Sequence, residues 1–257
     1  MELTNNTILI TGGTSGFGFE FASRFIDSGS TVIITGRDQS KLEQTRGRLP
    51  KVHIFQSDVS DPNAIAMLYH QVTKQFPDLN ILINNAGEMR ILNLHDTSID
   101  LLNITREVEI NLMGPIRMVH QFLPHLKTKK NAAIVNVTSG LALIPFPISP
   151  VYGATKSGLR SYTKSLRIQL KNTNIKVFEL IAPGANTPLN DKFSTVDGFD
   201  NKNSISPDKV VDVAIKAMMK DTFEIYPGIS RVLKIMARVA PDYLLRQTSK
   251  VGSKLMQ

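Results

Sequence analysis

Thr11-Gly12-Gly13-Thr14-Ser15-Gly16-Phe17-Gly18 is the stretch of sequence that decides the fold. It follows the short apolar run Thr7 to Ile10 and opens a helical pattern that continues to about Asp27. Glycines let the backbone approach a ligand closely, and the free N–H groups of the following helix favour an anion. The order strand, glycine turn, helix therefore predicts a site for the pyrophosphate of a dinucleotide, with a tight turn that binds nothing as the alternative. A P-loop is excluded, because no Gly-Lys-Ser/Thr follows.

Outward from this turn, short apolar runs alternate with helical stretches. The runs are continuously apolar, as strands of a parallel sheet covered by helices on both faces must be. The pattern predicts a single-domain α/β protein with a Rossmann-type, doubly wound parallel sheet and helices on both faces. We expect strands at 7–10, 31–35, 52–56, 81–84, 133–137 and 176–181, and helices at 17–27, 40–49, 62–76, 104–127 and 151–171.

The 257 residues contain no linker or internal repeat, so we expect one domain with three functional parts. Residues 1–183 would form the cofactor-binding core. Residues 184–206 are rich in Asn, Asp, Ser and Gly and predict one long substrate loop. Residues 229–257 form a basic, helical C-terminal extension.

Composition excludes several classes of protein. There is no cysteine and there are only five histidines, so we expect no disulfide, no thiol catalysis and no metal site. The net charge is +8, of which residues 231–257 carry +5, and aromatic residues are few, which argues against nucleic-acid binding. No apolar run is long enough to span a bilayer, and Met1 to Asn6 does not begin a secretory signal. We expect a cytoplasmic protein.

The end of the second predicted strand, Thr35-Gly36-Arg37-Asp38, bears on the choice of dinucleotide. An acidic residue at this place would bind the ribose hydroxyls of NAD. Here the place is taken by Gly36, and Arg37 follows, whose guanidinium can pair with a 2′-phosphate. The sequence favours NADP(H) over NAD(H), although Asp38 could instead neutralise Arg37.

Tyr152 and Lys156 lie four residues apart at the start of a predicted helix, so they share one helix face. A lysine cation near a phenol stabilises the phenolate and lowers its pKa. Ser139 ends the fifth predicted strand, where its hydroxyl can bind a substrate oxygen. A lone Tyr–Lys pair is usually a surface pair, but together with Ser139 and the glycine turn it predicts a catalytic site.

These motifs resemble the short-chain dehydrogenase/reductase family of about 250 residues, over residues 5 to about 228. The resemblance implies that Asp58 binds the adenine amino group, that residues 85–87 pack beside the adenosine ribose, and that residues 183–187 face the nicotinamide. Asn111 would hold a water joined to Lys156. With the glycine turn and Arg37, the implied cofactor-binding residues are Gly12, Thr14, Ser15, Gly16, Phe17, Gly18, Arg37, Asp58, Val59, Asn85, Ala86, Gly87, Tyr152, Lys156, Pro183, Gly184 and Thr187.

The implied function is an NADP(H)-dependent oxidoreductase that moves a hydride between nicotinamide and a carbonyl or alcohol, with Asn111, Ser139, Tyr152 and Lys156 as catalytic residues. Ser139 and Tyr152 would bind the carbonyl oxygen, and Tyr152 would donate the proton. Thr138 is a second candidate for the hydroxyl donor. The start of the chain and residues 133–142 more narrowly resemble DltE-type oxidoreductases. The alternative is a non-catalytic, cofactor-loaded protein of the same fold with a binding or regulatory role.

Two further segments bear on substrate and partners. Residues 141–147, with Leu189 and Phe193, predict an apolar wall and therefore a partly apolar carbonyl or alcohol substrate. The family resemblance favours a homodimer or homotetramer built on the helices at 104–127 and 151–171. In the extension we expect an amphipathic helix that ends near Pro241 and either packs over the substrate site or a neighbouring subunit, or makes weak contact with an anionic membrane. Its two faces carry Arg231, Lys234 and Arg238 on one side and Val232, Ile235, Met236 and Val239 on the other.

Overall fold

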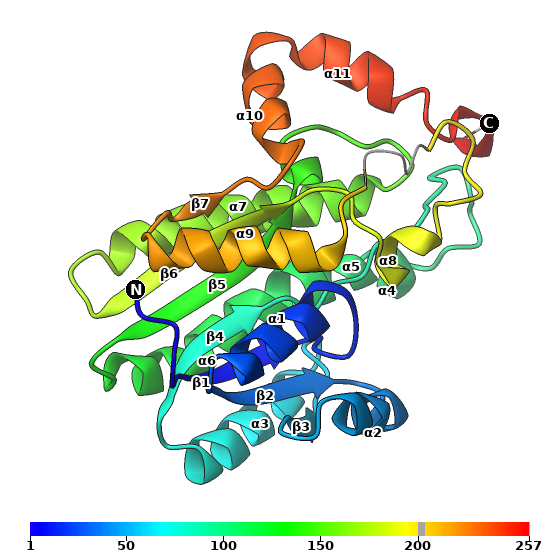
Figure 1. Ribbon diagram of the computed structural model, residues 1–257. Helices are drawn as coiled ribbons and strands as arrows, with labels where there is room; N and C mark the ends of the chain where they lie inside the picture. Colours follow the sequence, from blue (N-terminus) through cyan, green and yellow to red (C-terminus); the bar gives the residue numbers. More distant parts are fainter. Residues whose placement is uncertain (200–203, 257) are drawn as a thin grey trace.

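The computed structural model describes residues 1–199 and 204–256, and its centre is a seven-stranded parallel sheet in the order β3-β2-β1-β4-β5-β6-β7. The six predicted strands are confirmed, and a seventh, of two residues, extends the sheet beyond β6 (Figure 1). The strands are β1 Thr7–Thr11, β2 Thr31–Gly36, β3 His53–Gln56, β4 Leu79–Asn84, β5 Ala132–Ser139, β6 Ile175–Ala182 and β7 Glu224–Ile225.

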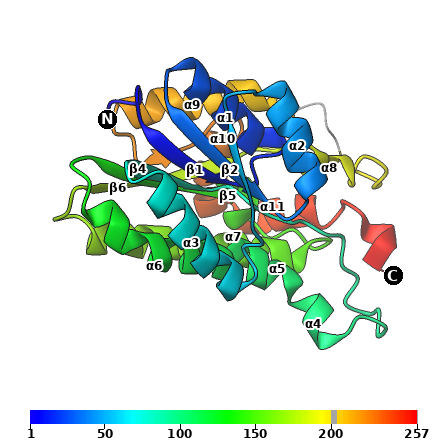
Figure 2. The same cartoon turned by 90° about the horizontal axis from the view of Figure 1, so that it is seen from below.

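Helices cover both faces of this sheet, as the continuously apolar strands predicted. Helices α1 and α9 lie on one face, and α3, α6 and α7 lie on the other (Figures 1 and 2). The helices are α1 Gly16–Asp27, α2 Gln39–Arg48, α3 Pro62–Gln75, α4 Leu101–Ile104, α5 Arg106–Val108, α6 Gly114–Lys127, α7 Pro150–Gln169, α8 Pro188–Asp191, α9 Pro207–Met219, α10 Ser230–Val239 and α11 Pro241–Thr248, with a π-helical turn η1 at Glu109–Met113 and 3₁₀ turns η2 at Gly140–Ala142 and η4 at Ser253–Met256.

The apolar side chains of the strands form one core on each side of the sheet. On one side Ile8 and Ile10 pack with Phe21 and Phe25 of α1, and all four are buried. On the other side Leu9, whose side chain points the opposite way, packs in a cluster that contains buried residues of α3 and α6. The alternation of side chains along a strand thus gives both helical layers an apolar surface to cover.

The single helix predicted over 104–127 is wrong. The structure divides this stretch into α4, α5, the π-helical turn η1 and the regular helix α6. Pro115 lies in the first turn of α6 and has no N–H to donate to the preceding turn, so the hydrogen-bond pattern changes there. Asn111 is in the π-helical turn, a geometry that is frequent at functional sites.

The predicted loop at 184–206 is partly ordered into regular structure. Helix α8 lies within it, and Ala185 forms a bridge to Ile205. Residues 200–203 of the predicted substrate loop lie outside the described residues. Within the described residues no helix is long and apolar enough to cross a membrane.

The strand order reverses between β1 and β4, since the chain passes from β1 outward to β2 and β3 and then returns to β4 on the other side. In doubly wound sheets a crevice for ligands forms at the carboxyl ends of the strands that flank such a reversal. The glycine turn after β1 and residues 85–87 after β4 both lie at this place.

Candidate active site

The glycine turn is built so that its backbone touches the chain after β4. Gly12 has φ +66°, and a Cβ atom there would lie 2.8 Å from Cα of Ala86. The amide of Asn85 donates hydrogen bonds to the carbonyl oxygens of Thr11 and Gly12 at 3.0 and 2.9 Å. A Cβ on Gly18 would overlap the carbonyl oxygen of Gly12, so the first turn of α1 packs directly under the loop.

A cavity of about 650 Å³ runs from this turn along the carboxyl ends of the strands. All of the predicted site residues line this cavity except Gly18 and Asn111. Gly18 lies in α1. The narrow backbone approach at Gly12 and the start of α1 at Gly16 form a cradle that fits the pyrophosphate of a dinucleotide. The residues of the cavity therefore fit a nicotinamide dinucleotide.

Two cations lie at the end of the cavity after β2. Arg37 is exposed and lines the cavity, and so does Lys41, which the sequence analysis missed. Asp38 accepts a hydrogen bond from the backbone N–H of Lys41 at 3.1 Å and so caps α2. No ion pair joins Arg37 and Asp38 among the described residues. Arg37 is thus open to an anionic group such as a 2′-phosphate.

The turn after β3 places Asp58 and Val59 on the cavity. One oxygen of Asp58 accepts hydrogen bonds from the backbone N–H and the hydroxyl of Ser60, at 2.9 and 2.7 Å. Val59 is buried and packs against the backbone at Gly114, the first residue of α6. Both side chains are therefore fixed by local contacts at the adenine end predicted for them.

Ser139, Tyr152 and Lys156 meet at the other end of the cavity, where β5 ends and α7 begins. Tyr152 and Lys156 are both buried, and the half-buried Ser139 lies beside the Tyr152 phenol. The Lys156 amine donates a hydrogen bond to the carbonyl oxygen of Val137 at 2.9 Å and lies 5.7 Å from the centre of the Tyr152 ring. The predicted trio is thus one cluster.

The electrostatics of this cluster differ from the expectation that Lys156 lowers the pKa of Tyr152. Burial raises the pKa of Tyr152 to about 12, and the Ser139 hydrogen bond opposes the rise. Burial also lowers the pKa of Lys156 to about 8. Desolvation of the Tyr152 phenolate therefore outweighs any stabilisation by the neighbouring Lys156 amine. That amine donates its hydrogen bond to the Val137 carbonyl oxygen. The phenol therefore holds its proton at neutral pH.

The structure separates the two hydroxyls at the end of β5. Thr138 is buried and donates its hydrogen bond to Glu179 at 2.8 Å, so its hydroxyl hydrogen is already engaged. Ser139 is the hydroxyl that contacts Tyr152. The geometry therefore favours Ser139 over Thr138 as the donor to a substrate oxygen.

Asn111 lies beside the cluster and fixes the loop after β4. Its side-chain amide donates to the carbonyl oxygen of Glu88 at 2.8 Å and accepts from the N–H of the same residue at 2.8 Å. It also donates to the hydroxyl of Thr155 at 3.2 Å. A Cβ on Gly87 would lie 3.3 Å from the Asn111 oxygen and 3.6 Å from the Lys156 amine, so Gly87 separates the two side chains.

The predicted apolar wall is present in part, because, of residues 141–147, only Leu141 and Phe146 line the cavity. Leu141, Phe146 and Leu189 line the cavity, but Phe193 is fully buried behind Phe146 and belongs to a small core cluster. Other apolar lining residues were missed, among them Met89 and Leu233. Leu233 belongs to α10 in the basic extension, far along the chain from the other lining residues.

The comparisons with known proteins agree with this geometry. Residues 6–197 match the family model for short chain dehydrogenases. The chain belongs to the short-chain dehydrogenase family. It is 37% identical over 247 residues to an uncharacterized oxidoreductase, DltE, of Bacillus subtilis (strain 168), covering 96% of this chain and 98% of that protein. Membership of this family of oxidoreductases, and the narrower resemblance to DltE, are thus confirmed.

Two solved short-chain dehydrogenases share the fold. One, from Burkholderia cenocepacia J2315 in complex with NADP, has a TM-score of 0.82 at 21% identity, covering 96% of this chain and 99% of that one. The other, from Burkholderia phymatum in complex with NAD, has a TM-score of 0.81 at 22% identity, covering 93% and 95%. At these identities the likeness establishes the fold of a short-chain dehydrogenase for this chain.

Proposed function

We propose that this short-chain dehydrogenase is an NADP(H)-dependent oxidoreductase acting on a carbonyl or alcohol group, with Tyr152 as its acid and base. The observation that carries the proposal is the cluster of half-buried Ser139 with buried Tyr152 and Lys156 at the end of a cavity that begins at the glycine turn. When bound, the cofactor supplies the hydride. The test is turnover of a panel of aldehydes and ketones with NADPH and with NADH.

The chain's own residues would then bind and protonate the substrate oxygen. Ser139 orients the oxygen by a hydrogen bond, and Tyr152 donates a proton to it as negative charge develops. The raised pKa of Tyr152 suits this donation, because the phenol is protonated over the whole neutral range. Lys156 and Asn111 would return a proton to Tyr152.

NADP(H) is the cofactor we propose, ahead of NAD(H). Arg37 and Lys41 give the ribose end of the cavity two cations, and Asp38 is engaged at the start of α2. A 2′-phosphate, absent from NAD(H), would gain charge-assisted hydrogen bonds from such a pair. In the remaining parts of the cofactor site, the predicted residues from the glycine turn to Thr187 take the roles stated for them above.

The proposed substrate is a small molecule with a partly apolar body. Leu141, Phe146, Leu189, Met89 and Leu233 surround the position beside Ser139 and Tyr152. Burial of apolar substrate surface against such a wall favours binding by about 25 cal/mol for each Å² removed from water. A cytoplasmic location is part of the same proposal, because the pool of reduced nicotinamide cofactor lies inside the cell.

Two kinds of macromolecular contact belong to the proposal. A homodimer or homotetramer would form through α6 and α7, the regular helices of the stretches 104–127 and 151–171, where Ile168 of α7 is 66% exposed. Nucleic acid is not a proposed partner. The second contact is weak binding of the basic extension to an anionic membrane surface.

The membrane contact rests on the orientation of α10. Its apolar residues Val232, Ile235 and Val239 are 56%, 59% and 71% exposed, while Leu233 on another face packs inward. Arg231 and Arg238 are exposed beside the apolar stripe. A twofold contact with a second copy would bring the same cations together, whereas an anionic lipid surface complements them. We therefore propose that the exposed apolar stripe of α10, formed by Val232, Ile235 and Val239, contacts an anionic membrane surface.

The alternative function is a non-catalytic, cofactor-loaded protein with a binding or regulatory role. The cavity would suit it equally at the cofactor end. The complete set of Ser139, Tyr152, Lys156 and Asn111 counts against it, since a protein that only binds the cofactor has no need for all four. Cofactor binding without turnover of any carbonyl would favour this alternative.

A further inference from the structure

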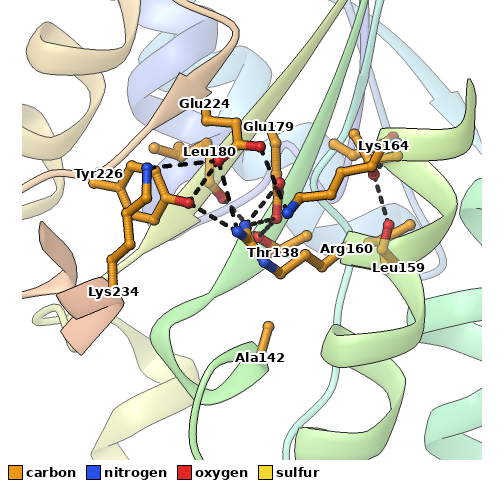
Figure 3. A network of polar contacts seen from close by, with 12 residues as sticks. Thr138, Ala142, Leu159, Arg160, Lys164, Glu179, Leu180, Glu224, Tyr226 and Lys234 are labelled. Carbon is orange, nitrogen blue, oxygen red and sulfur yellow. Dashed lines mark hydrogen bonds and ion pairs between the residues drawn. The ribbon is translucent and has the colours of Figure 1, made fainter. Parts of the chain in front are cut away.

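A buried carboxylate lies directly behind the end of β5. Glu179, in β6, is fully buried, and each of its two oxygens accepts a hydrogen bond from Arg160 Nη1 at 2.9 Å (Figure 3). One of the oxygens also accepts the hydrogen bond of Thr138. Arg160 is one helical turn after Lys156, and Thr138 immediately precedes Ser139. The pair therefore joins the two elements that carry the catalytic cluster.

The same network continues to α10. Arg160 Nη2 donates to the Tyr226 phenol oxygen at 2.8 Å, and that phenol donates to Glu224 of β7 at 2.7 Å (Figure 3). The Lys234 amine lies 3.8 Å from the Glu224 carboxylate and 4.3 Å from the centre of the Tyr226 ring. An ion pair and a cation–π contact thus tie α10 to the sheet edge.

Leu233, next to Lys234, contacts the catalytic end of the cavity. It lines the cavity, and a Cβ on Gly140, the residue after Ser139, would lie 3.0 Å from Leu233 Cδ1. Neighbouring residues of α10 thus have separate contacts. Leu233 forms the wall of the substrate end, and Lys234 connects the helix to Tyr226 and Glu224.

Loss of Lys234 would not leave Glu224 unpaired. Lys164 and Arg167 each lie 3.7 Å from one Glu224 oxygen, and Arg160 lies 3.6 Å from the other. The surplus of cations means that the core of the network survives without the Lys234 amine. A change at Lys234 therefore tests the position of α10 rather than the stability of the sheet.

We propose that Leu233 limits the size of the substrate, and that Lys234, held by Tyr226 and Glu224, is the positioning residue that keeps Leu233 against Gly140. This proposal rests on the proposed function in one respect, since a size limit is observed on a substrate. The position of α10 can be measured without a substrate.

The size limit is tested with Leu233→Ala and the reduction of propanal and 2-naphthaldehyde with NADPH. Shortening the side chain should raise kcat/KM for the naphthaldehyde relative to propanal by about tenfold or more, the scale of a changed apolar pocket. Val232→Ala is the control, because Val232 is exposed on the same helix and does not line the cavity. An unchanged ratio in Leu233→Ala, or an equal change in Val232→Ala, would overturn the size limit.

The positioning role is tested with Lys234→Met, which removes the charge and keeps most of the apolar stem. Amide hydrogen exchange over 229–239 should become faster by about tenfold or more, and the ratio of the two aldehydes should shift in the same direction as in Leu233→Ala. Lys234→Arg should restore both. Arg238→Met is the control, because Arg238 is an exposed cation of the same helix and is not among the cations paired with Glu224. Exchange as slow in Lys234→Met as in Arg238→Met would overturn the positioning role.

The experiments distinguish failure of the proposed function from failure of the size limit at Leu233. If the unmodified protein reduces no carbonyl, the proposed function and the size limit both fall, and the exchange experiment still decides the role of Lys234. If it reduces carbonyls and Leu233→Ala keeps the same ratio, the proposed function stands and the size limit falls.

Discussion

The Lys156 amine donates its hydrogen bond to the Val137 carbonyl oxygen at 2.9 Å and lies 5.7 Å from the centre of the Tyr152 ring. Both side chains are buried, so each ionises less readily than it would in water. Tyr152 is therefore a protonated acid at neutral pH, and burial makes the charged form of the Lys156 amine less stable than it is in water.

Stability should depend on pH through Lys156. The pKa of Lys156 is about 8 in the folded protein, against an ordinary 10.5. Between about pH 8 and pH 10 the unfolded chain therefore binds more protons at this group, and the Lys156 contribution to the free energy of unfolding rises with pH. The slope is at most about 1.4 kcal/mol per pH unit. Tyr152, whose pKa is raised, opposes this trend only above about pH 10.

Urea unfolding from about pH 8 to pH 10 measures the Lys156 contribution to the free energy of unfolding. The Lys156→Met variant lacks this contribution. The difference in stability between unmodified protein and Lys156→Met should shift in favour of the unmodified protein as the pH rises. Lys74→Met, at an exposed position of α3, should show no such shift. A difference that stays constant from about pH 8 to pH 10 would show that Lys156 is not desolvated.

The close approach at Gly12 predicts a large effect of one methyl group. Gly12→Ala would place Cβ 2.8 Å from Cα of Ala86 at a residue with φ +66°. We expect a loss of about 1–3 kcal/mol in stability and weaker binding of NADPH, because the loop must move. Gly47→Ala is the matched control, since Gly47 is in α2 with nothing within 4 Å of the added methyl. Equal stability of the two variants would contradict the tight approach.

The preference for NADPH should depend on Arg37. Arg37→Ala should reduce the ratio of NADH to NADPH dissociation constants by about tenfold or more, the effect of one charge-assisted contact. Lys41→Ala should reduce the same ratio. Lys171→Ala, an exposed cation after α7, is the control for net charge. Equal dissociation constants for the two cofactors in the unmodified protein would show that Arg37 and Lys41 do not select NADPH.

Binding of the basic extension to membranes should depend on salt. The protein should sediment with vesicles that contain phosphatidylserine at low ionic strength and be released at high ionic strength, as screened charges are. Arg231→Glu with Arg238→Glu should abolish this binding, and Lys74→Glu with Lys171→Glu should retain it. If the unmodified protein stays in the supernatant at low salt, the exposed stripe of α10 has another occupant.

The sheet and most of the site could be predicted from local signals. Continuous apolar runs reveal buried parallel strands, and the glycine turn, Ser139 and Tyr152 lie where strands end and helices begin. The position of Arg37 after β2 follows from the same reasoning. These features are encoded within a few residues of one another, so the sequence shows them directly.

Features that depend on contacts between distant segments could not be predicted. Strand β7 has two residues, too few for a periodic pattern, and one of them is the charged Glu224. The contact of Asn111 with Glu88 joins residues that are 23 positions apart. The amphipathic pattern of α10 was visible, but the pattern does not tell which face packs inward. It is Leu233, not the stripe with Ile235, that reaches the cavity.

The central claim is tested most directly by Tyr152→Phe, assayed for NADPH binding and for reduction of the carbonyl panel. The variant keeps the ring packing and removes the proton donor, so NADPH should still bind. Turnover of every substrate that the unmodified protein reduces should fall by at least about 100-fold, the usual scale for a lost acid. Turnover at the unmodified rate in Tyr152→Phe would contradict the account, because the proton would then come from another group.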